Sequence, residues 1–177
     1  MFTFPEAPGD GKGSAEVGPA PSHHRSDCNI CRKQDGLKTG SALLDVPRAG
    51  GYIVEGEHFL VEHAPLQSSS AGTVILETRR HLLDFGEMTP AELAEFGSTV
   101  HRLVPAVKAA TGVQRIYLLA LMERAPHFHM WLVPKKDVGE LRGVLYMAQT
   151  PPLTASQSDA EAMSRAIRAA FERTSVT

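Results

Sequence analysis

The chain has 177 residues, of which 42% are hydrophobic and 21% charged, and its formal net charge is −2. This length suits one domain with a real hydrophobic core, and the composition is that of a soluble globular protein. The weak net charge excludes a strong attraction to nucleic acid or acidic membranes, and no apolar run of about eighteen residues predicts a membrane span. The N-terminus has no secretory signal pattern, so we expect a cytoplasmic protein.

Residues 1–25 are crowded with Gly, Pro, Ala and Ser and show no apolar periodicity. This composition predicts a disordered tail, with order beginning near Asp27. Three strand-like segments follow at 52–54, 58–63 and 73–78, each bounded by turn or charged residues. We expect them to be antiparallel neighbours in one sheet.

A helix is predicted to begin after Thr89, where a capping hydroxyl is followed by Pro90 at the first helical position and by Glu92, which can return to the cap. Apolar residues recur at spacings of three and four up to about Gly112. Pro105 lies inside this pattern and predicts a kink or a lost turn.

Residues 115–122, with a continuous apolar run from Ile116 to Met122, are typical of a strand buried on both faces. A short link leads to the next strand, so the two should pair antiparallel. Residues 158–161 have the form of a capping box and predict a C-terminal helix. Its inner side would carry Met163, Ile167 and Phe171.

The segment from His127 to Lys135 alternates along that next strand. A period of two sends His127, His129 and Trp131 to one face and the apolar residues between them to the other. A lone His-x-His pair is weak evidence, because eight histidines in this chain give one by chance with a probability of roughly one in three.

The only two cysteines, Cys28 and Cys31, form a C-x-x-C pair. Two cysteines placed at random would have this spacing roughly one time in ninety, which makes a metal hook the first explanation. In a reducing compartment, thiolate ligands or a redox dithiol are expected rather than a structural disulfide.

Together, the C-x-x-C pair, the sequence Arg-Arg-His ending at His81, and the segment His127–Lys135 resemble the histidine triad (HIT) superfamily of nucleotide hydrolases and transferases. The family motif alternates three histidines with apolar residues and is often followed by Pro-Arg. Here Trp131 stands in place of the third histidine, and Lys135 stands in place of the arginine.

The resemblance implies an α+β fold, a HIT-like five-stranded antiparallel sheet with one main helix and an N-terminal zinc hook, to which the sequence adds a C-terminal helix. We therefore divide the chain into a flexible tail at 1–26, a HIT-like domain at 27–147 and a C-terminal helical extension at 148–177.

The zinc-containing branch of the family implies a structural zinc ion held by Cys28, Cys31, His81 and His127, a set that also suits zinc on chemical grounds. Alternatives stay open at this stage. The cysteines may instead form a redox dithiol, His81 may be an ordinary surface residue, and His23 and His24 are rival ligands. The remaining histidines, at 58, 63 and 101, have no motif around them and are assigned no role.

By the same resemblance, His129 is the nucleophile that attacks the α-phosphate of a nucleotide and forms a nucleotidyl-histidine, while a backbone carbonyl of its own strand holds its second ring nitrogen. Trp131, Arg124 and Lys135 are predicted to bind substrate. Trp131 has one N–H donor and no acceptor, so it cannot replace a histidine in proton transfer.

The leading hypothesis is therefore a hydrolase or nucleotidyl transferase acting on purine nucleotides or their conjugates. The alternative is a non-catalytic or weakly active nucleotide-binding module, with Trp131 and Phe59 as apolar walls. A third reading makes the C-x-x-C pair a redox or zinc-mediated contact, with the helix after Pro152 as a docking element. The resemblance also implies a homodimer.

Overall fold

The computed structural model describes residues 25–41, 44–136, 140–149 and 154–174. The first 24 residues, which include nearly all of the predicted tail and both His23 and His24, lie outside this part. The elements are, in chain order, α1 (Asn29–Gln34), β1 (Val54–Glu55), β2 (Phe59–His63), η1 (Leu66–Ser68), β3 (Val74–Thr78), η2 (Phe85–Glu87), α2 (Pro90–Thr111), β4 (Ile116–Leu119), β5 (His129–Pro134), α3 (Gly143–Gln149) and α4 (Gln157–Arg173).

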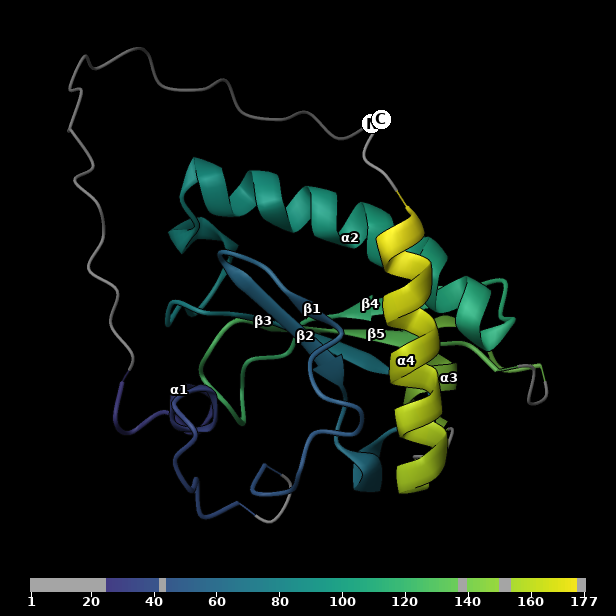
Figure 1. Cartoon of the computed structure of the whole chain (residues 1–177), viewed down its shortest axis with the longest axis horizontal. Coiled ribbons are helices and arrows are strands. Elements are labelled where there is room, and N and C mark those ends of the chain that lie inside the picture. The colour runs from purple at the N-terminus through teal and green to yellow at the C-terminus, as the bar shows by residue number, and fades with distance from the viewer. Residues whose placement is uncertain (1–24, 42–43, 137–139, 150–153, 175–177) are drawn as a thin grey trace, which may run out of the picture.

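The five strands form one sheet in the order β1-β2-β3-β5-β4, and every neighbouring pair is antiparallel. Figure 1 shows this sheet with the long helix α2 lying across it and α4 crossing near the C-terminal end of α2. The predicted α+β fold is therefore confirmed. The sheet places β5, the strand of the histidine motif, between β3 and β4.

Strand β4 differs from the prediction of a strand buried on both faces. It is only four residues long, it lies at an edge of the sheet, and Leu118 is 49% exposed. A continuous apolar run does not distinguish an edge strand from a central one, because it carries no information about the number of neighbours.

Helix α2 begins as predicted. The Thr89 hydroxyl accepts a hydrogen bond from the Glu92 N–H, and the Glu92 carboxylate accepts one from the Thr89 N–H. The turn predicted to be lost at Pro105 is not lost, since the helix continues to Thr111. Proline removes one backbone hydrogen bond, and the packing of buried neighbours such as Leu103 and Val107 on the sheet holds the helix together.

The core lies between α2, α4 and one face of the sheet. That face contributes Met130 and Leu132 of β5 and Phe128, which directly precedes the strand, as the period of two predicts. Phe59 is fully buried there, with its ring 5.7 Å from that of Phe96 on α2. The hypothesis that Phe59 forms a wall of a nucleotide pocket is therefore wrong.

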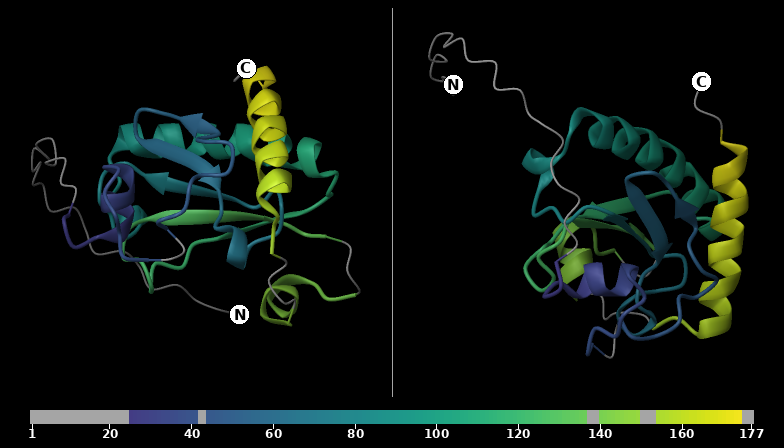
Figure 2. Two further views of the ribbon diagram at one scale, coloured as in Figure 1. Left: turned by 60° about the horizontal axis from the view of Figure 1, so that its bottom comes forward. Right: turned by 60° about the vertical axis from the view of Figure 1, so that its left-hand side comes forward.

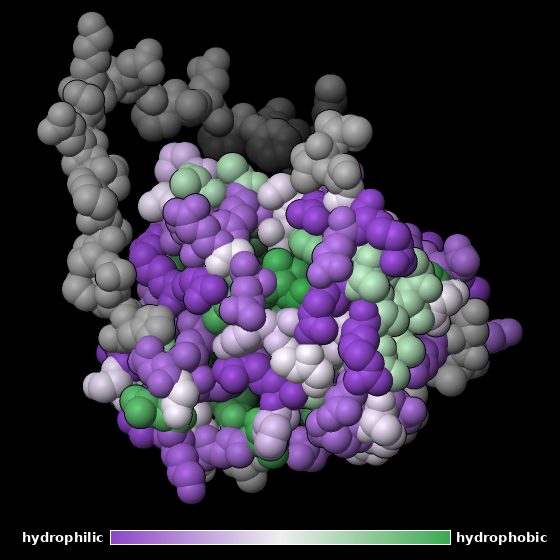
Figure 3. Space-filling view, in the orientation of Figure 1, coloured by the Kyte–Doolittle hydropathy of each residue, from purple (hydrophilic) through white to green (hydrophobic). Residues whose placement is uncertain are grey.

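The predicted C-terminal helix exists as α4, but its cap is Ser156, whose hydroxyl accepts from the Asp159 N–H, and not Ser158. Ile167 and Phe171 belong to the core and Met163 packs against it, so the predicted inner side of the helix is confirmed. The sequence did not predict what this side contacts, which is mainly α2. It is also tied to the loop before β1, because the Ser164 hydroxyl donates to the carbonyl of Ala49 at 2.7 Å. Hydrophilic residues predominate on the face of the molecule in Figure 3, which includes α4.

The opposite face of the sheet carries the histidine motif. In Figure 2 (left), α2 lies above the sheet and the short helix α3, which the sequence did not predict, lies below it. Glu77 and Ile75 of β3 pair with His129 and Trp131 of β5, so these four side chains share this lower face. No helix in the described part of the chain is long and apolar enough to cross a membrane.

Candidate functional site: a metal cluster beside a histidine-lined cavity

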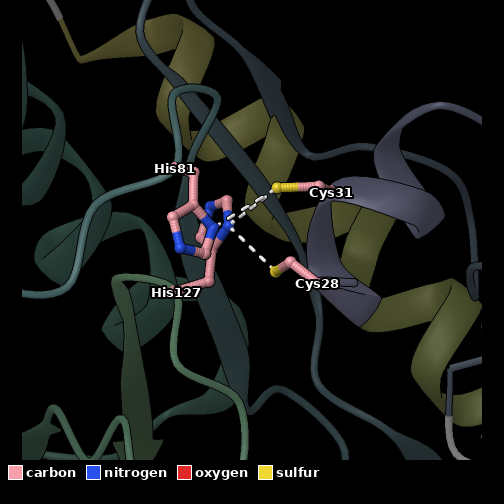
Figure 4. A group of neighbouring side chains, drawn as sticks. All are labelled: Cys28, Cys31, His81 and His127. Carbon is pink, nitrogen blue, oxygen red and sulfur yellow. Dashed lines mark hydrogen bonds between the residues drawn. The ribbon is translucent and has the colours of Figure 1, made fainter. Parts of the chain in front are cut away.

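Four metal-binding side chains meet where α1 approaches the sheet (Figure 4). They are Cys28 and Cys31 from α1 and its cap, His81 after β3 and His127 before β5, and their ligand atoms all lie within 4.8 Å of one another. The Nδ1 atom of His127 is 3.6 Å from Cys28 Sγ and 3.4 Å from Cys31 Sγ, and Cys31 Sγ is 3.5 Å from His81 Nδ1.

These distances fit a tetrahedral ion. Zn–S bonds of about 2.3 Å and Zn–N bonds of about 2.0–2.1 Å, at the tetrahedral angle, give S···N edges of about 3.5 Å. The three S···N distances in the structure lie within about 0.2 Å of this value. The four predicted residues thus cluster as a Cys2His2 zinc site.

A second layer of contacts orients His127 for this role. Its Nε2–H donates to the carbonyl of Thr78 at 2.7 Å, with the Thr78 hydroxyl 3.1 Å away. Because that bond fixes the proton on Nε2, the lone pair is on Nδ1, which faces the sulfurs. Burial lowers the pKa of His127 to about 4, so the ring is neutral near pH 7.

The cysteines do not fit a redox dithiol. Cys28 is 5% exposed and Cys31 is fully buried. Burial raises the pKa of the Cys31 thiol to about 11 in the absence of a metal. A redox cysteine requires an accessible thiol with a lowered pKa, so this environment favours metal ligation.

Beside the cluster, α1 is anchored by buried ion pairs. Lys33 Nζ lies 2.5 Å from a carboxylate oxygen of Glu62 and 2.6 Å from one of Glu77, and Arg48 Nε lies 2.5 Å from the second oxygen of Glu62. Burial disfavours the charge on Lys33, but the carboxylates of Glu77 and Glu62 outweigh this effect, and the net shift raises the pKa of Lys33. The ammonium therefore stays charged and ties the zinc hook to β2 and β3.

His129 is held by the same segment of chain. Its Nδ1 lies 2.8 Å from the carbonyl oxygen of His127, which can only accept, so in the neutral tautomer Nδ1 carries the proton and Nε2 carries the lone pair. This is the strand carbonyl that the resemblance implied. The side chain of His127 belongs to the metal cluster, and its backbone carbonyl orients His129. A displacement of the cluster would therefore also displace His129.

His129 borders a cavity of about 550 Å³. Its apolar lining residues are Trp131 and Val133 of β5, Leu119 and Leu121 at and after the end of β4, and Tyr146 and Met147 of α3. Its polar lining residues are Ser68, Ser69, Ser70 and Thr73 between β2 and β3, and its charged ones are Glu123 and Arg124.

The structure brings two of the three predicted substrate residues to this cavity. Trp131 and Arg124 line it, whereas Lys135 does not. The Lys135 ammonium lies 5.4 Å from the ring centre of Tyr146. His63, which was assigned no role, is a satisfied buried histidine: Nδ1 contacts the Ala64 carbonyl and Nε2 accepts from the Gly72 N–H.

Sequence reasoning missed the wall formed by α3. Tyr146 is 5% exposed, and its hydroxyl accepts from the Lys136 N–H, while the Tyr117 hydroxyl accepts from the Gly143 N–H. These two hydrogen bonds and the 5.6 Å ring contact between the tyrosines fix α3 beside the cavity. Tyr117 and Tyr146, two of only three tyrosines in the chain, were the available signal.

By sequence, no family model matches the chain, and neither does any curated protein. Solved structures do match. One is a HIT-like protein involved in cell-cycle regulation from Bartonella henselae, with 12% identity and a TM-score of 0.60 over 84% of this chain and 98% of the other. The chain has the histidine triad fold.

Two further structures share this fold. A zinc-bound histidine triad family protein from Mycobacterium smegmatis has 18% identity and a TM-score of 0.58, over 82% of this chain and 94% of the other. A hypothetical histidine triad nucleotide-binding protein from Sulfolobus tokodaii has 17% identity and a TM-score of 0.59, over 82% and 92%. At these identities the comparison establishes the fold, and residue roles rest on the geometry above.

Proposed function

We propose that the protein is a hydrolase or nucleotidyl transferase that acts on purine nucleotide conjugates at the α-phosphate through His129. The observation that carries this proposal is the 2.8 Å hydrogen bond from His129 Nδ1–H to the carbonyl of His127. In the neutral ring this bond leaves a lone pair on Nε2, and His129 borders a cavity of about 550 Å³. A neutral imidazole fixed in one tautomer is a preorganised nucleophile.

In the first step, the Nε2 lone pair forms a bond to the α-phosphorus, and the bond from phosphorus to the leaving group breaks with its electron pair. In the second step, water or another acceptor attacks the phosphorus, the N–P pair returns to Nε2, and the acceptor's proton passes to solvent. Two displacements of this kind replace one difficult displacement.

Arg124 and Trp131 would act on the phosphate and the leaving group. Arg124 is an exposed cation at the cavity and can neutralise phosphate oxygens. Trp131 cannot supply a proton to the departing group. The reaction should therefore favour leaving groups that depart as stable anions or take their proton from solvent.

The zinc ion would have a structural role. Four protein ligands would complete a tetrahedral shell and leave no position for substrate, which is the pattern of a structural ion. When bound, the ion would join the N-terminal hook to the segment after β3 and to the segment before β5. The protein's own residues then hold His129 in place through His127.

A nucleotide-binding module without turnover is the second candidate, and Trp131 in place of a motif histidine favours it. We also propose that the protein is a homodimer. The outer edge of β4 has no strand neighbour in the described residues, and the exposed Leu118 lies on it, as a sheet continued across a twofold axis requires.

Product formation tests the function. The wild-type protein and His129→Ala are incubated with adenosine and guanosine phosphoramidates, dinucleoside polyphosphates and nucleotide sugars, and products are separated by chromatography. Turnover by the wild type alone supports the proposal. Saturable nucleotide binding without product favours the binding module, and turnover by a folded His129→Ala protein would refute the role of His129.

A further inference from the structure

Trp131 is a partly exposed tryptophan in the cavity of His129. It lies two residues along β5 from His129 on the same face, so their Cα atoms are about 7 Å apart. Its cross-strand neighbours are Ile75 on one side and Leu119 on the other. The indole therefore has apolar support on both sides and opens onto the cavity.

Among the described residues, the Trp131 ring has no polar or aromatic partner. In the part of the chain that the structure describes, the indole N–H makes no hydrogen bond, and no aromatic or cationic side chain stacks on the ring. Buried or half-buried tryptophans usually find a partner for the N–H and pack their faces. Trp131 is partly exposed and lines the cavity, so part of its ring is accessible to a ligand.

The rest of the cavity offers few free donors. The Ser69 hydroxyl donates to the Pro65 carbonyl at 2.8 Å, Ser68 donates to the same carbonyl at 3.3 Å, and Ser70 and Thr73 bond to each other at 3.2 Å. Arg124 supplies a charged donor for the phosphate, and because most of these hydroxyls are engaged within the protein, recognition of the rest of a ligand depends on apolar and ring contacts.

We propose that Trp131 is a specificity-determining residue that stacks on a flat aromatic ring joined to the phosphate held at His129. The preferred substrate class is therefore a phosphate ester or amidate that carries such a ring. The ring is either the nucleobase or an aromatic leaving group. This inference rests on the proposed function for the placement of the phosphate, and its test does not require turnover.

Trp131 is the only tryptophan of the chain, so its fluorescence reports on this cavity alone. The full-length, zinc-loaded protein is titrated with two matched pairs of ligands, and indole is excited where nucleotides absorb little. Adenosine monophosphate and ribose 5-phosphate differ by the nucleobase, whereas phenyl phosphate and methyl phosphate differ by a ring attached directly to the phosphate.

Saturable quenching by at least one ring-bearing ligand, and not by its ringless partner, is expected. Tighter binding by adenosine monophosphate assigns the ring to the nucleobase, and tighter binding by phenyl phosphate assigns it to the leaving group. Equal responses within both pairs, or no response to any of the four ligands, would overturn the inference. The quenching is read without turnover, so failure of catalysis and failure of stacking are separate results.

Titration calorimetry on Trp131→Leu and Trp131→Phe measures how much the stacking contributes to the binding affinity. Loss of the stack should weaken binding of the favoured ring-bearing ligand by roughly 5- to 150-fold, the range for base–aromatic stacking, while the affinity of its ringless partner changes little. Trp131→Phe should recover part of the loss. Equal weakening for both members of the pair in a folded Trp131→Leu protein would also overturn the inference.

Discussion

Replacing Lys33 by methionine should destabilise the protein strongly. Lys33 is 8% exposed, and its ammonium bridges carboxylates of Glu62 and Glu77, which are 6% and 1% exposed. After the substitution, Glu62 keeps its ion pair with Arg48. Glu77 keeps only a long contact of 3.5 Å to the Gln34 amide, so a charge remains buried without a cation.

Breaking a buried ion pair by removing one partner costs about 3–5 kcal/mol, because the remaining charge is desolvated and uncompensated. That is a large share of the roughly 5–15 kcal/mol by which a domain is usually stable. In a chain of this size, each kcal/mol lowers the melting temperature by about 2–4 °C, so Lys33→Met should melt about 6–20 °C lower.

Denaturant unfolding of the zinc-loaded protein, followed by circular dichroism, measures this difference. Lys38→Met is the matched control, because Lys38 is exposed on the adjacent segment and its loss should change stability by less than about 0.5 kcal/mol. Adding Glu77→Gln to Lys33→Met should recover part of the stability. A Lys33→Met protein as stable as the control, or a double variant less stable than Lys33→Met, would refute the reasoning.

Three more predictions concern stability. Chelation of the metal should lower the melting temperature of the wild type but not that of Cys31→Ser. Metal analysis should find well below one zinc ion per chain in Cys31→Ser. If chelation lowered the melting temperature of both proteins equally, the metal assignment would be contradicted. Hydrogen bonding to Arg80 lowers the pKa of Glu92 from 4.5 to about 2. The ionised carboxylate therefore contributes up to about 3 kcal/mol to the free energy of unfolding; this contribution is complete above pH 4.5 and is lost as the pH falls toward 2. Glu92→Gln should therefore be less stable at neutral pH by up to that amount and show a smaller further loss in acid unfolding, whereas an unchanged acid profile would count against the pair. Finally, Gly50→Ala should cost about 1–3 kcal/mol more than Gly36→Ala in denaturant unfolding, because both have φ above +70° but only at Gly50 would a Cβ lie 2.8 Å from the Cβ of Ser164; equal costs would show that α4 is not docked there.

The parts of the fold that were predicted correctly depend on local signals. The capping box of α2 was found because Thr89, Pro90 and Glu92 are adjacent in sequence. The metal cluster was found because two cysteines three residues apart are rare and the resemblance supplied the two histidines. The outcome at Pro105 shows the limit of a local rule, since packing on the sheet decided that the helix continues.

The parts that were missed depend on contacts between distant residues. Lys33 reaches Glu62 and Glu77, which are 29 and 44 positions away, and no local pattern predicts that those two strand glutamates point inward to one lysine. Strand β4 is exposed because it lies at the edge of the sheet. Tyr146 was missed as a cavity residue because it lies on α3, a helix that the sequence did not predict. The catalytic role of His129 and the binding roles of Trp131, Arg124 and Lys135 stay predictions.

Direct detection of a nucleotide on His129 is the measurement that tests the central claim. The wild-type protein is mixed with its preferred nucleotide conjugate and quenched in alkaline denaturant, because a phosphorus–nitrogen bond is labile in acid. Intact mass and peptide mapping then locate any adduct. We expect one nucleoside monophosphate on the peptide of His129, absent in His129→Ala; turnover with the adduct on another residue, or turnover retained in His129→Ala, would contradict the account.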